Sequence, residues 1–364
     1  MFNQYRNRWR VIAIIFLIGA VTSGGALLKT QSASGASPAP PDLRQTGLYS
    51  DFASRTVDSR NLHYSPQYPL WSDGAVKQRW IYLPPGKSID ATNPDLWTFP
   101  VGTKVWKEFS FDGHRVETRL LEQLGRNEWR FATYAWNADE SAAVLVPDTG
   151  LRGVAEIQPG IKHDLPGVKD CQACHVSSRT EILGFSALQL SPDRDPQAPH
   201  AEPAAPDMAN LQWLIQKKLI HSYPSVWAGE PLRIKAPNPR SRAALGYLHA
   251  NCGNCHNPAG SLESLSIILR HSVAPDALEK TAPKSAINRT GRFRIPDTKP
   301  GETFLIRPGD PEHSAVAYRM ATRNPFRQMP PLGTKIADAE AVNLISLWIK
   351  EDLVRPDDSP AKEP

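Results

Sequence analysis

Alternating apolar and polar residues predict several short β-strands in the first half of the chain. Two strand-like runs, residues 103–111 and 114–121, flank Asp112-Gly113, which is a strong signal for a two-residue hairpin turn. Further strand-like runs are residues 69–86, 128–136 and 143–146. Because short strands separated by turns are typical of all-β layers, we expect an antiparallel sandwich or small barrel over residues 49–162.

Apolar residues recur at helical spacing in the second half. The two clearest runs are RSRAALGYLHAN at residues 240–251 and DAEAVNLISLWIKEDL at residues 338–353. Shorter helical runs are residues 210–219 and 311–322. The whole pattern predicts a multidomain α+β fold, in which an antiparallel β-rich N-terminal domain is followed by mainly α-helical domains.

The N-terminus has the layout of a secretory signal. Three arginines precede an apolar run at residues 11–21, and small residues follow that run. We therefore expect residues 1–36 to be a signal peptide that directs the protein to the periplasm. The alternative is an uncleaved anchor at residues 11–28, which would associate the protein with a membrane, although this run is short for a transmembrane helix.

The net positive charge suggests an anionic partner, but nearly all of the excess basic residues lie in the N-terminal segment. The chain has 364 residues, with 42 Lys and Arg against 37 Asp and Glu, and a net charge of +5. Four of the basic residues lie in residues 1–36, which hold no acid, so the remaining chain has 38 basic and 37 acidic side chains. Because this balance is nearly neutral, charge gives no support to a nucleic-acid partner.

All four cysteines lie in two CxxCH pentapeptides. CQACH comprises Cys171, Cys174 and His175, and CGNCH comprises Cys252, Cys255 and His256. This is the attachment signature of c-type haem, in which two thiols bind the porphyrin covalently and the adjacent imidazole binds the iron. Disulfides or a structural zinc are alternatives in an exported protein, but neither accounts for a histidine directly after each pair. We therefore expect two covalently bound haem c groups.

Met329 is the predicted sixth ligand of the iron that His256 binds. It lies well after His256 in the chain, and Pro330 and Pro331 follow it directly. A thioether is a soft, neutral ligand that raises the reduction potential of a haem, and the two prolines stiffen the loop that holds it.

Several residues could supply the sixth ligand of the first haem. We expect His200, because it lies between Pro199 and Pro203 in a proline-rich loop that resembles the loop of Met329. Other candidates are His63, His114, His163, Met208 and His221. The remaining possibility is a five-coordinate iron, with His200 a solvated loop histidine.

Several segments of the chain resemble those of a known protein family. The segments are PLWSDGAVKQRWIYLPPG, WTFPVGTKVWKEF, ETRLL, DCQACH with LGFSALQLSPDRDP and APHAEP, AALGYLHANCGNCHNP and QMPPLG. Together they resemble bacterial exported dihaem c-type cytochromes over roughly residues 63–352, and residues 240–352 are similar to class I cytochrome c. The resemblance implies haem at both motifs and a role in electron transfer or haem oxidoreduction. Dihaem cytochrome c peroxidases are similar in carrying two such motifs, but they are mainly helical, and the β-rich first half departs from them.

The motifs also suggest a division of the chain. The expected parts are a signal peptide or anchor (1–36), a linker (37–48), a β-rich domain (49–162), a first haem-binding region (163–232), a mainly α-helical cytochrome c-type haem domain (240–353) and a polar tail (354–364).

Electron transfer in the periplasm, with a redox partner protein, is the predicted function. Two irons whose six ligand positions are all filled favour an electron carrier over a catalyst, because the ligands need not change between oxidation states. One alternative is a peroxidase-type oxidoreductase with an open position at the first haem. Another is a haem-bearing binding or sensing module that uses the β-rich domain.

Overall fold

The computed structural model describes residues 38–176, 182–225, 231–260, 262–274 and 282–354. The predicted signal peptide, the anchor alternative at residues 11–28 and nearly all of the predicted tail lie outside these residues. Within them, no helix has both the length and the apolar character that a membrane crossing requires.

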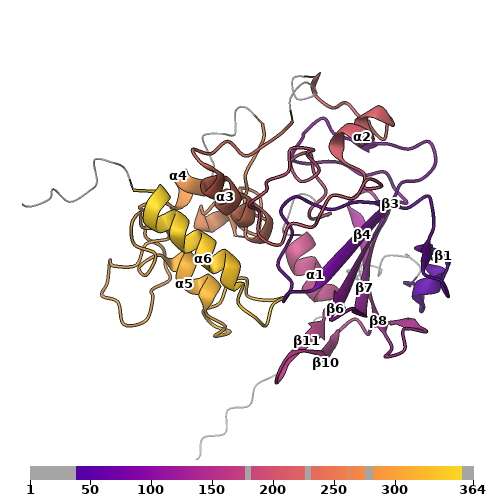
Figure 1. Ribbon diagram of the computed structural model, residues 1–364, viewed down its shortest axis with the longest axis horizontal. Helices are drawn as coiled ribbons and strands as arrows, with labels where there is room; N and C mark the ends of the chain where they lie inside the picture. The colour runs from indigo at the N-terminus through magenta and orange to yellow at the C-terminus, as the bar shows by residue number, and fades with distance from the viewer. Residues whose placement is uncertain (1–37, 177–181, 226–230, 261, 275–281, 355–364) are drawn as a thin grey trace, which may run out of the picture. The chain divides into compact units, whose positions relative to one another are not determined.

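Six antiparallel strands form the main sheet, in the order β3-β4-β6-β7-β8-β9 (Figure 1). The strands are β3 Leu62–His63, β4 Val76–Tyr82, β6 Lys104–Phe111, β7 His114–Gly125, β8 Glu128–Trp136 and β9 Ala143–Leu145. β6 and β7 pair up to Phe111 and His114, and the turn residues Asp112 and Gly113 both have positive φ, 48° and 83°. A type I′ turn requires this conformation, so the predicted hairpin is confirmed.

The two faces of this sheet carry different side chains. On one face, Trp80, Trp106 and Leu120 lie opposite one another on β4, β6 and β7 and are buried in an aromatic core. On the other face, a row of cross-strand neighbours on β4, β6, β7 and β8 is apolar. That row is Ile81, Val105, Leu121 and Phe131. The first helix, α1, packs against this second face through β8 (Figure 1).

Six further short strands form three two-stranded sheets. They are β1 Tyr49–Asp51 with β2 Thr56–Val57, β10 Leu151–Gln158 with β11 Ile161–Leu165, and β5 Ile89–Asp90 with β12 Ile220–His221. The last pair is parallel and joins segments that are far apart along the chain.

Among the described residues, all six α-helices begin after the main sheet, and they are separated by long stretches without α-helix. They are α1 Val168–His175, α2 Leu211–Gln216, α3 Pro239–Asn251, α4 Ala282–Ala286, α5 Ala315–Ala321 and α6 Ala339–Leu347, and a π-helical turn, Trp348–Asp352, follows α6. α3, α5 and α6 contribute Leu248, Met320 and Ile345 to one core. Tyr68 and Leu188, from well before α3, belong to the same core, and the chain from Pro38 onward forms one compact unit.

The predicted fold class, with mainly α-helical cytochrome c-type haem domains, is wrong. The described residues hold six α-helices and about 20% helix, together with a sheet of six antiparallel strands. Residues 182–210 and 287–314 contain no helix, and residues 192–206 contain five prolines, each of which removes a backbone donor and clashes with a preceding helical turn. The expected sandwich or barrel is instead a single open sheet with small two-stranded sheets beside it.

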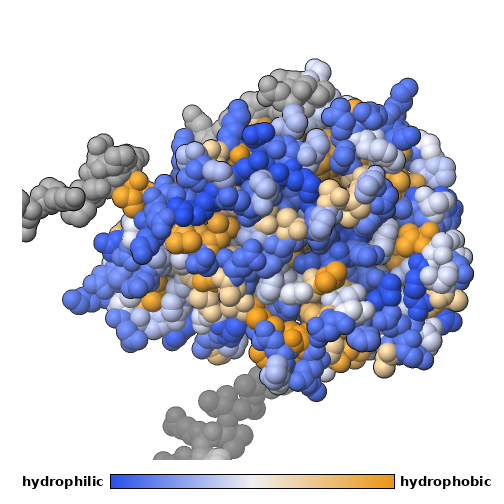
Figure 2. Space-filling view, viewed as in Figure 1, coloured by the Kyte–Doolittle hydropathy of each residue, from blue (hydrophilic) through white to orange (hydrophobic). Residues whose placement is uncertain are grey.

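Hydrophilic side chains cover most of the face in Figure 2, and the hydrophobic areas on it are small and separate. Scattered apolar side chains of this kind are normal for a protein surface. This face therefore offers no large apolar surface as a candidate functional site.

Candidate functional site

Helix α1 carries the first CxxCH motif. Its first turn is capped because the carboxylate of Asp170 accepts a hydrogen bond from the backbone N–H of Gly167 (3.0 Å). At the other end of the helix, the ring of His175 packs against Phe131 of β8, with 5.5 Å between the ring centroids. The sheet therefore fixes the position of the histidine of this motif.

The second motif begins where α3 ends. The backbone N–H groups of Cys252 and Gly253 both donate to the carbonyl of Leu248, at 3.0 and 2.9 Å. A Cβ atom on Gly253 would lie 2.8 Å from Cα of Arg270, so glycine lets the two backbones approach closely. The motif is thereby held in a tight turn rather than in a continuing helix.

The four cysteines are free thiols, and burial keeps them protonated. Burial raises the pKa of Cys252 to about 12 and that of Cys174 to about 11. The nearby Cys255 also raises the pKa of Cys174, so the second cysteines of the two motifs lie close enough to interact. Burial also raises the pKa values of Cys171 and Cys255. Neither pair of cysteines forms a disulfide in this structure.

His256 has two properties of a metal ligand. Burial, and then the charge of Arg319, lower its pKa, so the imidazole is neutral at pH 7. Its Nδ1 atom is buried and has no hydrogen-bond partner among the described residues. A buried polar atom without a partner is uncommon in a folded protein, and a neutral imidazole offers a lone pair to a metal.

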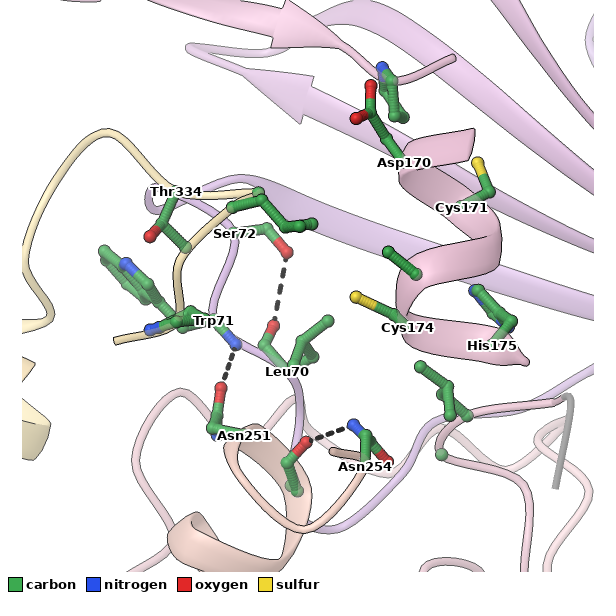
Figure 3. Close-up of a pocket in the computed structure, with 18 of the residues that line it drawn as sticks. Leu70, Trp71, Ser72, Asp170, Cys171, Cys174, His175, Asn251, Asn254 and Thr334 are labelled. Carbon is green, nitrogen blue, oxygen red and sulfur yellow. Dashed lines mark hydrogen bonds between the residues drawn. The ribbon is translucent and has the colours of Figure 1, made fainter. Parts of the chain in front are cut away.

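Both motifs border one cavity of about 760 Å³. Cys171, Cys174 and His175 line it from α1, and Asn251, Asn254 and Cys255 line it from the end of α3. Figure 3 shows α1 and the end of α3 on either side of Leu70, Trp71 and Ser72, with Cys174 pointing towards these residues. Two segments that are distant in the sequence therefore meet at the same space.

Contacts from the C-terminal region close one edge of this cavity. The carboxylate of Asp73 accepts hydrogen bonds from the backbone N–H groups of Lys335 (2.8 Å) and Ile336 (2.9 Å). The indole N–H of Trp71 donates to the carbonyl of Ile336 (3.0 Å). Because Thr334 and Lys335 also line the cavity, the wall of the cavity is complete only when residues 334–336 are in place.

Comparison with known proteins adds no relative to this picture. No family model, curated protein or solved structure matches this chain. The assignment of a function therefore depends on the residues of the site.

Met329 lies on a loop beside α5. Its backbone N–H donates to the carbonyl of Arg319 (2.8 Å), and its own carbonyl accepts from the guanidinium of Arg323 (3.2 Å). Arg319 is also close enough to His256 to lower its pKa, so both predicted ligands of the second haem adjoin the same arginine. Pro330 lines the cavity, whereas Met329 is not among the lining residues.

His200 occupies a different environment from the one its predicted role suggests. Its Nε2 lies 2.9 Å from Oδ1 of Asp338, and its Nδ1 lies 3.5 Å from Oε2 of Glu340. The ring packs against Trp71, with 4.7 Å between the centroids, and His200 is not among the residues that line the cavity. In this structure His200 connects its loop to the N-terminus of α6, and ligation of iron by His200 stays a prediction.

The substitution His200→Ala separates these two roles. We expect it to lower the free energy of unfolding by about 1–3 kcal/mol, because Asp338 is buried and would lose a charge-assisted hydrogen bond. Urea unfolding measures this loss, and His114→Ala, at a side chain that is 78% exposed, is the matched control. In the same His200→Ala protein, an absorption spectrum that shows no new high-spin haem would exclude His200 as a ligand.

A buried charge cluster at the cavity was not predicted as a unit. His163, on β11, lines the cavity, and its Nε2 lies 3.0 Å from Oε1 of Glu117. Glu117 is fully buried and also binds Arg119. Burial alone would lower the pKa of His163, but the carboxylates of Asp73, 3.8 Å from Nδ1, and Glu117, hydrogen-bonded to Nε2, outweigh it and raise the pKa. The sequence identified His163 only as one of several ligand candidates, because its partners come from distant parts of the chain.

The raised pKa of His163 predicts a pH dependence of stability. Because the folded pKa exceeds the unfolded one, protonated His163 stabilises the fold at pH values below the unfolded pKa, and this contribution is lost as the pH rises through the folded pKa. We expect His163→Gln to lose most stability near pH 6 and less towards pH 9, with a slope of at most about 1.4 kcal/mol per pH unit. Urea unfolding across this range measures the difference between His163→Gln and the wild type.

The residues around the cavity fit a c-type haem in several respects. The volume of about 760 Å³ lies in the range of sites that enclose large ligands. The walls include apolar side chains, such as Leu70, Leu121 and Ile182, together with the unpaired thiols. Among the described residues, no three or more His, Cys, Asp or Glu side chains form a group that could hold a metal ion. A haem iron needs at most two ligands from the chain.

Proposed function

We propose that this protein is a periplasmic dihaem c-type cytochrome that transfers electrons. The observation that carries the proposal is the meeting of two CxxCH motifs, distant in the sequence, at one cavity. Because neither motif forms a disulfide, both thiols of each motif are available for covalent attachment of haem. When bound, haem iron supplies reversible one-electron chemistry.

Each motif has defined roles for its residues under this proposal. Cys171 and Cys174 attach the first porphyrin, and Cys252 and Cys255 attach the second. His175 and His256 are the proximal ligands, while Met329 and His200 are the proposed sixth ligands. The neutral state of His256, caused chiefly by burial, supports its role, because a protonated imidazole cannot bind iron.

The walls of the cavity have a separate part in this function. Apolar side chains exclude water, and a low local dielectric raises the effect of each nearby charge on a redox centre. The first motif lies on α1, which packs against the sheet, and the second lies in a tight turn. Both motifs would therefore hold their haem groups on rigid elements. A periplasmic redox partner protein is the expected source or acceptor of electrons.

The proposal is tested by expressing the full chain with a cytochrome c maturation system. We expect two haems per polypeptide by pyridine haemochrome quantitation and a mass increase of two haem groups for the purified protein. A colourless product with the mass of the bare polypeptide would contradict the proposed function.

A peroxidase-type oxidoreductase is a second candidate, and the environment of His200 favours it. Since both ring nitrogens of His200 face carboxylates, the sixth position at the first haem would stay open to a small molecule. Added cyanide or peroxide distinguishes the two functions. A rapid spectral change at one haem supports the oxidoreductase, and an unchanged spectrum at both supports electron transfer.

A further inference from the structure

Three basic side chains lie side by side on the sheet face that borders the cavity. Arg79 on β4 is the cross-strand neighbour of Lys107 on β6, and Lys107 is the neighbour of Arg119 on β7. We call these residues the basic row. Like charges directly opposite one another destabilise a sheet, so the row requires negative charge nearby.

Carboxylates neutralise the two ends of the basic row. Arg79 binds Glu202, with 2.7 Å between Nη1 and Oε2, although its Nη2 is buried without a hydrogen-bond partner. Arg119 binds Glu117, with 2.9 Å between Nε and Oε2. Each carboxylate has further partners, since Ser65 donates to Glu202 and His163 contacts Glu117. These two anions are therefore already engaged.

Lys107, at the centre of the basic row, has no such partner. Within the described part of the chain, its ammonium makes no ion pair or hydrogen bond, and it lies over the ring of Phe109, 4.7 Å from the centroid. Leaving a charge desolvated and unpaired is costly. Burial, followed by the charges of Arg79, Lys77 and Arg119, lowers the pKa of Lys107 well below its usual range.

The basic row faces the cavity rather than the opposite core. All three of its residues line the cavity together with Cys171 and Cys174. Burial raises the pKa values of both thiols, whereas the charge of Arg119 lowers them. The guanidinium of Arg119 therefore lies near the two cysteines. A group bound in the cavity would therefore meet the central ammonium and the flanking guanidinium groups together.

We propose that Lys107, flanked by Arg79 and Arg119, binds a carboxylate or similar small oxyanion in the cavity. This oxyanion is either a propionate of an attached haem or a free small anion. Only the first source depends on the proposed function. An anion at this position would neutralise the central charge and satisfy donors that the two engaged carboxylates leave free.

The substitution Lys107→Met tests the site through thermal stability of the full, matured protein. Its matched control is Lys104→Met, because Lys104 lies on the same strand and the other sheet face, where it donates to the carbonyl of Thr46. Each protein is melted in sodium chloride and in sodium acetate of equal ionic strength. Lys107→Gln, which keeps a donor but no charge, gives the same comparison where the Met variant is not produced.

Two results would support the site and identify its source. If a propionate occupies it, the wild type melts higher than Lys107→Met in both salts, acetate has no effect, and the variant lowers the midpoint potential of one haem. If a free anion occupies it, saturating acetate raises the melting temperature of the wild type by about 5 °C and leaves Lys107→Met unchanged. Lys104→Met should respond to acetate as the wild type does.

Other results would overturn the site. If Lys107→Met melts higher than the wild type in both salts and acetate changes neither protein, no anion is bound, because removal of an unpaired, partly buried charge is then stabilising. Conversion of one haem to high spin in Lys107→Met would make the amine an iron ligand instead. A colourless protein contradicts the proposed function alone, and the melts in acetate still decide the free-anion site.

Discussion

Replacing both Cys252 and Cys255 by Ala is expected to lower the haem content from two groups per chain to one. Under the proposed function, the second porphyrin would lose its covalent attachment without these thiols, whereas Cys171 and Cys174 would still hold the first. Pyridine haemochrome quantitation and intact mass measure the change. Because both motifs border one cavity, we also expect the midpoint potential of the remaining haem to shift.

The matched variant replaces Cys171 and Cys174 by Ala and should lose the other haem. Replacement of all four cysteines should give a colourless protein. Retention of two covalent haems after the loss of either pair would contradict the assignment of one haem to each motif. Loss of both haems from one double variant that remains folded would show that the two attachments depend on each other.

Gly246→Ala is expected to destabilise the fold strongly through one added methyl group. A Cβ atom at Gly246, in the middle of α3, would lie 2.0 Å from Cε1 of Tyr68. Tyr68 is buried, and its hydroxyl lies 3.1 Å from Oδ2 of Asp195, so the ring cannot move away freely. We expect a loss of about 3 kcal/mol or more from overpacking, although alanine is the better helix former by about 1 kcal/mol.

Urea unfolding of the same protein preparation measures this loss. The control is Gly86→Ala, where the new methyl group meets no atom within 4 Å and only the positive φ of 72° opposes it. That conformation costs roughly 1–2 kcal/mol for a residue with a Cβ atom. Equal losses for the two substitutions would mean that α3 and Tyr68 can separate without cost.

Local sequence signals predicted individual elements well. The Asp112-Gly113 turn, the strands on either side of it and the helix that precedes Cys252 all appear close to their expected positions. These elements depend on neighbours within a few residues, through turn conformation or helical periodicity. The expectation of mainly α-helical haem domains failed, because prolines and long-range contacts decide the structure of the segments between the helices.

The site could be predicted only in part for a related reason. The CxxCH motifs are contiguous, so their chemistry can be recognised from the sequence. The shared cavity depends on the approach of Cys174 to Cys255, and the basic row depends on strand pairing that brings Arg79 beside Lys107. The sequence predicted His200 as an iron ligand, whereas in the structure its ring contacts Asp338, which is 138 residues later. Contacts at such separations leave no local pattern.

The hydrogen bonds from Lys335 and Ile336 to Asp73 also impose an order of events during biogenesis. The acceptor is made 262 residues before Lys335, and at roughly 5–20 residues per second the ribosome needs about 10 to 50 s to supply the donors. During this interval the first pair of thiols has emerged while the late segment that completes the pocket wall is missing. Until the C-terminal region docks, one edge of the cavity beside the first pair of thiols therefore stays open.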